Sequence, residues 1–171
     1  GVRVVAYSGN VAPFLERKDY AQQGYVFSEP FVAQQQGAQT RNLMVSELGF
    51  NPYTSILVTN KRQLDSDRDL VHRMVRASIR GWQKYLEDPV AVNEHIHSVN
   101  EKMSLDILAF GVKQLKPLCL PDGMPVEKLG QMTPQRWEQL ADQLRSIELL
   151  SGSVKAVDAY DLGGLATGVK R

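Results

Sequence analysis

The sequence has 171 residues, of which 43% are hydrophobic and 23% charged, a composition typical of a folded protein with one core of ordinary size. Its 20 basic and 19 acidic residues leave a net charge of +1, which excludes a strong overall field attracting nucleic acid or anionic membranes. Because of this near-neutral charge, we expect no nucleic-acid partner. The single cysteine, Cys119, excludes an internal disulfide and a multi-cysteine zinc site.

The first sixty residues alternate β-rich runs with helix signals, and Pro13 and Pro30 each stand where a helix can begin. The runs expected to form strands are 2–7, 24–27, 41–45 and 53–59. This alternation predicts an α/β fold with a mixed sheet flanked by helices. Because the first run expected to form a strand begins at residue 2, with nothing before it, we expect the sequence to begin inside a longer protein.

Residues 67–149 show helical periodicity almost throughout. The clearest helix is predicted over 67–87, where acidic residues precede the first turn and Asp88 and Pro89 end the pattern. A helix over 104–115 should end before Pro117. The remaining predicted helices are 90–99 and a last one that Thr133 and Pro134 open and Gly152 ends.

Sequence motifs of catalysis are absent: we find no phosphate-binding glycine loop, nucleophile elbow or zinc-protease pattern. His95 and His97 lie two residues apart on a predicted helix, so their side chains point about 200° apart and do not converge on a metal. The sequence therefore predicts neither a catalytic centre nor a cofactor or metal.

The segment 24–30 is the most suggestive of binding, because a predicted strand ends in Ser28 and Glu29 directly before Pro30. Ligands in open α/β folds bind at the carboxyl ends of strands. The more frequent alternative is that Ser28 caps the following helix and Glu29 complements its dipole. Both interpretations stay open from the residues alone.

Four segments occur in a familiar order along the chain: 7–9, 24–30, 49–59 and 77–82. With Gly130-Gln131-Met132 and Arg136-Trp137, they resemble the periplasmic solute-binding proteins of nitrate, sulfonate and thiamine-pyrimidine-precursor ABC importers, in their carboxyl-terminal part. The likeness extends to about residue 160 and so covers nearly the whole chain.

The resemblance implies a type II periplasmic-binding fold, incomplete at its amino terminus. Residues 1–50 would form part of the second α/β lobe, 51–60 a hinge strand, and 61–171 a helical part that packs on the first lobe. It also implies reversible binding of a small solute in an interlobe cleft without catalysis, and delivery to a membrane permease. The expected location is periplasmic or lipid-anchored outside the cytoplasm.

The resemblance also implies a set of ligand contacts. In pyrimidine-binding relatives the carboxylate at the position of Glu29 faces the cleft and pairs with the aminopyrimidine, which suits a group that accepts two parallel hydrogen bonds. The residues expected to bind the solute are Tyr25, Ser28, Glu29, Asn51, Tyr53, Gly9 and Asn10.

Two other functions remain open at this point. One is a ligand-sensing module of a signalling protein, which nothing in these residues separates from a transport receptor. The other is a pyrimidine-precursor synthase-like enzyme, which is expected to need a cysteine-rich motif that Cys119 alone does not supply. If the first lobe is missing, exposed apolar surface on the later helices predicts self-association.

Overall fold

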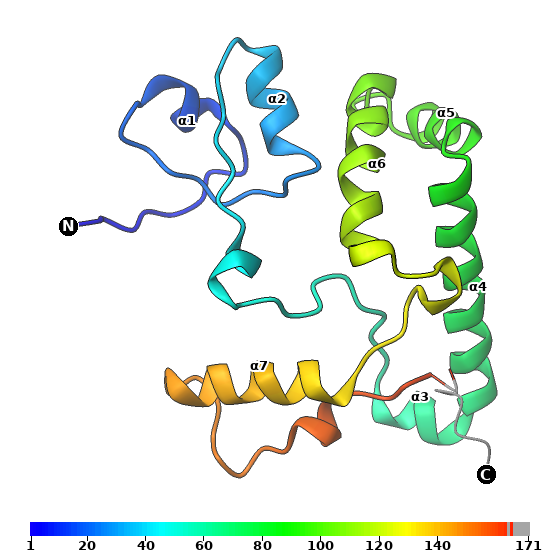
Figure 1. Cartoon of the computed structure of the whole chain (residues 1–171). Coiled ribbons are helices and arrows are strands. Elements are labelled where there is room, and N and C mark those ends of the chain that lie inside the picture. Colours follow the sequence, from blue (N-terminus) through cyan, green and yellow to red (C-terminus); the bar gives the residue numbers. More distant parts are fainter. Residues whose placement is uncertain (164, 166–171) are drawn as a thin grey trace. The chain divides into compact units, whose positions relative to one another are not determined.

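The computed structural model describes residues 1–163 and residue 165, which form helices joined by long irregular segments (Figure 1). The α-helices of this part are α1 (Ala12–Glu16), α2 (Glu29–Gln35), α3 (Lys61–Ser66), α4 (Arg68–Glu87), α5 (Val90–Val99), α6 (Leu105–Cys119) and α7 (Pro134–Ser146). Its 3-10 helices are η1 (Val45–Leu48), η2 (Pro121–Gly123), η3 (Val126–Lys128) and η4 (Ala156–Ala159).

The predicted mixed sheet is wrong for the part of the chain that the structure describes, because none of these residues forms a β-strand. The run 2–7 shows the physical reason. Val2 and Val4 are 97% and 92% exposed, and a strand is stable only beside other strands that pair with its backbone. β-Propensity reflects how a side chain fits a pleated, half-buried surface, so the run stays irregular where no such surface forms.

Most of the predicted helices are confirmed, because their signals are local. Pro13 and Pro30 lie in the first turns of α1 and α2. The Asp67 carboxylate accepts a hydrogen bond of 3.0 Å from the Leu70 amide at the start of α4. The Thr133 hydroxyl likewise accepts from the amide of the third residue of α7, at 3.4 Å.

Two helix ends differ from the prediction. Helix α6 continues through Pro117 to Cys119, because a proline this close to the end removes a single ladder bond, the one to the Lys113 carbonyl. Helix α7 ends at Ser146 rather than near Gly152, and Glu148 then adopts a left-handed φ of 60°. Helix α6 thus extends past Pro117 and ends shortly before Pro121, whereas α7 ends six residues before Gly152.

The chain divides into two compact units, and the first consists of residues 1–42 and 84–125. In this unit α5 packs against α6, and α2 packs against α6 through Phe31 and Phe110, whose ring centroids are 5.1 Å apart. Gly111 of α6 approaches Phe27 so closely that a Cβ there would lie 3.2 Å from the Phe27 carbonyl oxygen. Helix α6 therefore supports the segment that leads into α2.

The second unit consists of residues 43–83 and the described residues from 126 onward, and α7 is the helix to which its irregular segments attach. Arg136 donates from Nε to the Asn51 carbonyl oxygen at 2.6 Å, and its guanidinium carbon lies 4.1 Å from the Tyr53 ring centroid. The Trp137 ring stacks on Tyr160 with centroids 5.4 Å apart. Segments before and after α7 are thus fixed on one helix.

Replacing Arg136 with lysine should lower the free energy of unfolding by about 1 kcal/mol, because lysine keeps the charge but loses the planar group that reaches both Asn51 oxygens. Urea denaturation followed by circular dichroism measures the change. The control is Arg80→Lys on an exposed position of α4, for which we expect almost no change. Equal stability of the Arg136→Lys and wild-type proteins would contradict the anchoring role of Arg136.

Candidate functional site

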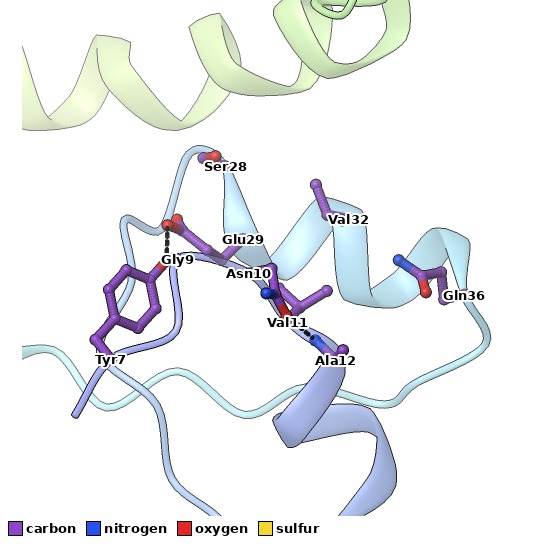
Figure 2. A pocket seen from close by; sticks show the side chains of 9 residues that line it. All are labelled: Tyr7, Gly9, Asn10, Val11, Ala12, Ser28, Glu29, Val32 and Gln36. Carbon is purple, nitrogen blue, oxygen red and sulfur yellow. Dashed lines mark hydrogen bonds between the residues drawn. The ribbon is translucent and has the colours of Figure 1, made fainter. Parts of the chain in front are cut away.

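A pocket of about 420 Å³ lies in the first unit, between the segment 7–12 and helix α2 (Figure 2). The residues that line it are Tyr7, Gly9, Asn10, Val11, Ala12, Ser28, Glu29, Val32 and Gln36. Its volume falls within the range of roughly 300 to 1,000 Å³ that is common for small-ligand sites. The pocket is therefore large enough for a small organic solute.

Glu29 is the only charged side chain among the described residues that line this pocket. Its Oε2 accepts a hydrogen bond of 2.8 Å from the Tyr25 amide, while its Oε1 accepts one of 3.4 Å from the Tyr7 hydroxyl, drawn in Figure 2. The first is a short charge-assisted bond, and the second is close to the upper limit of hydrogen-bond length. Oε1 can therefore accept a better donor while Oε2 stays fixed.

Gly24 makes room for this arrangement. A Cβ at residue 24 would lie 3.1 to 3.2 Å from three side-chain carbons of Glu29. Any larger residue would therefore push the Glu29 side chain away from its present position. Gly24, before α2, and the first turn of α2 together determine where the Glu29 carboxylate lies.

The segment before α1 forms the facing wall. Asn10 Oδ1 accepts from the Ala12 amide at 2.9 Å, and Asn10 Nδ2 donates to the Ser8 carbonyl oxygen at 3.3 Å. Gly9 has a φ of +77°, which glycine adopts without strain. These bonds make a local asparagine turn that fixes the shape of the wall.

Four of the seven residues predicted to bind the solute line this pocket: Gly9, Asn10, Ser28 and Glu29. Tyr25 reaches Glu29 through its backbone, whereas the residue as a whole is 57% exposed and its ring stacks on Phe27 with centroids 5.1 Å apart. The capping role considered for the Ser28 side chain is wrong, since Ser28 stands at the N-cap without a side-chain capping bond.

The other two predicted residues belong to the second unit. Asn51 is bound by Arg136, and the Tyr53 hydroxyl accepts a hydrogen bond of 2.9 Å from the Thr133 amide. In the structure, Asn51 and Tyr53 attach the segment 51–53 to α7 and its N-cap residue. Neither lines the pocket beside Glu29, and a ligand-binding role for all seven residues stays a prediction.

Sequence reasoning missed several lining residues. Val32 and Gln36 follow Glu29 by three and seven residues, which is the spacing of one helix face, so this spacing could have identified them. Tyr7 stands 22 residues before Glu29, and no local pattern links the two. Val11, which is 7% exposed, provides buried apolar surface at the pocket.

Other kinds of site find no support in the described part of the chain. No group of three or more His, Cys, Asp or Glu side chains there is arranged to hold a metal ion. His97 Nδ1 instead lies 2.8 Å from the Met103 carbonyl oxygen. Burial raises the pKa of the half-buried Cys119 thiol, which disfavours a reactive thiolate. None of the helices described is both long and apolar enough to cross a bilayer.

The sequence matches the family described as NMT1/THI5 like over residues 2–92, more than half of the chain and all of the pocket lining. The chain belongs to this family. Membership indicates a solute-binding or related function and confirms the predicted resemblance at this coarser level. The comparisons with curated proteins and with solved structures found no match.

The contact between Tyr7 and Glu29 predicts a measurable titration. Partial burial and the nearby Glu29 carboxylate both raise the pKa of the Tyr7 hydroxyl, because both disfavour the phenolate. Glu29→Gln removes the negative charge and should lower the pKa of Tyr7, whereas Glu16→Gln on α1 should leave it unchanged. NMR of isotope-labelled tyrosine rings from neutral to alkaline pH measures both. An unchanged Tyr7 pKa in Glu29→Gln would contradict the contact.

Proposed function

We propose that this chain is part of the substrate-binding component of an ABC-type importer and binds a small solute reversibly in the pocket beside Glu29. One observation carries the proposal: among the described residues, Glu29 Oε1 at the pocket accepts only a long hydrogen bond from Tyr7, while Oε2 is held firmly by the Tyr25 amide. A carboxylate fixed on one side and available on the other is suited to receive a ligand donor. Membership of the NMT1/THI5-like family supports the binding role.

The chemistry of the pocket favours an aminopyrimidine, the thiamine precursor type of solute, over nitrate or a sulfonate. Its lining contains the Glu29 carboxylate and, among the described residues, no lysine, arginine or histidine that would attract an anion. An amino group can donate an N–H to Glu29 Oε1, and Val11 and Val32 offer apolar surface to a flat ring. Nitrate would meet a carboxylate instead and be repelled.

The proposal includes release of the solute unchanged to a membrane permease. A role of this kind implies a periplasmic or lipid-anchored location outside the cytoplasm.

Isothermal titration calorimetry with 4-aminopyrimidine, sodium nitrate and taurine tests the proposal. We expect saturable binding of the aminopyrimidine alone. Glu29→Gln should weaken it by about 10- to 100-fold, the loss that corresponds to one hydrogen bond with a charged group. Glu16→Gln, which neutralises an exposed carboxylate of α1 in the same unit, should bind like the wild type.

Two results would overturn this proposal. Nitrate or taurine binding that is unaffected by Glu29→Gln would show that the carboxylate does not select the solute. Chromatographic detection of a product after prolonged incubation with the aminopyrimidine would show that the protein is an enzyme.

A further inference from the structure

A second pocket lies in the first unit at the carboxyl-terminal end of α6, apart from the residues assigned to the solute. It has a volume of about 520 Å³ and is lined by Lys113, Lys116, Pro117, Leu120, Gly123 and Met124. This volume also falls within the range of roughly 300 to 1,000 Å³ that small ligands occupy. The proposed solute-binding function gives this pocket no role.

Helical spacing explains how these side chains come together. Residues 113, 116 and 117 follow one another at steps of three and one, which places them on one face of α6, and Leu120 directly follows the end of the helix. The buried residues of α6, Leu108 and Gly111, lie on a different face. Beyond the helix, Gly123 takes a φ of +73°, the chain turns, and Met124 completes the lining of the pocket.

The two lysines give the pocket its charge. Neither Lys113 nor Lys116 forms an ion pair with a carboxylate among the described residues. Cations near a helix carboxyl end are favoured by the helix dipole, but the dipole does not account for an apolar hollow beside them. Pro117, Leu120 and Met124 supply that apolar surface.

We propose that this pocket binds a small organic carboxylate. Its anionic group would lie between Lys113 and Lys116, and its apolar body would cover Pro117, Leu120 and Met124. An inorganic anion would leave the apolar surface exposed to water, and a neutral apolar molecule would leave the two ammonium groups without a counter-charge. A ligand that combines both properties satisfies both parts of the lining.

Octanoate tests the proposal, with octanol as the neutral molecule of the same length and acetate as the anion without an apolar body. Backbone amide NMR shifts of the isotope-labelled protein report where each binds. We expect octanoate at millimolar concentrations to shift the amides of residues 113–124 saturably, and the other two compounds to bind much more weakly. The double variant Lys113→Gln with Lys116→Gln should weaken octanoate binding by about tenfold, the effect expected from two exposed charge contacts.

Two controls separate this pocket from other surfaces. Lys102→Gln removes an exposed positive charge from the turn before α6 and should leave octanoate binding unchanged. Glu29→Gln should also leave it unchanged, so a failure of either proposed site is distinguishable from a failure of the other. Equal binding of octanol and octanoate to the wild type, or full octanoate affinity in the double variant, would overturn the proposal.

Discussion

Hydrogen bonds from helix side chains to backbone groups hold the irregular segments of both units in place. Glu29 of α2 accepts from the Tyr25 amide, Arg136 of α7 donates to the Asn51 carbonyl, and Gln143 of α7 donates to the Gly49 carbonyl at 2.8 Å. Backbone polar groups need partners, and in the described residues no strand supplies them. Long polar side chains on helices therefore supply some of the backbone hydrogen bonds that neighbouring strands would supply in a sheet.

This constraint gives the Glu29 carboxylate two roles at once. Its Oε2 has a structural role, because the bond to the Tyr25 amide holds the segment before α2. Its Oε1 is available to a ligand in the pocket, because the Tyr7 hydroxyl is a distant and replaceable donor. The core adds little rigidity of its own, since no large side chain in the described part is fully buried. Hydrogen bonds such as the one from the Tyr25 amide to Glu29 therefore hold the pocket lining in place, although no large side chain beneath it is fully buried in the described part.

Helices were predictable from the sequence because their signals lie within the helix or next to its ends, whereas the absence of a sheet was not. Asp67 and Thr133 act at the start of the helices that they were expected to open. The strand predicted at 53–59 depends on partners far along the chain, and Tyr53 instead binds at α7. The same distinction applies to the site, where the position of Glu29 follows from the first turn of α2 but its contact with Tyr7 does not.

We propose above that a small solute with an N–H donor binds beside Glu29. The most direct measurement is a crystal structure of the protein co-crystallised with 4-aminopyrimidine. We expect the ligand in the pocket between the segment 7–12 and α2, with its amino group hydrogen-bonded to Glu29 Oε1 in place of the Tyr7 hydroxyl. A ligand bound instead against Asn51 and Tyr53, with the Tyr7 bond intact, would contradict it.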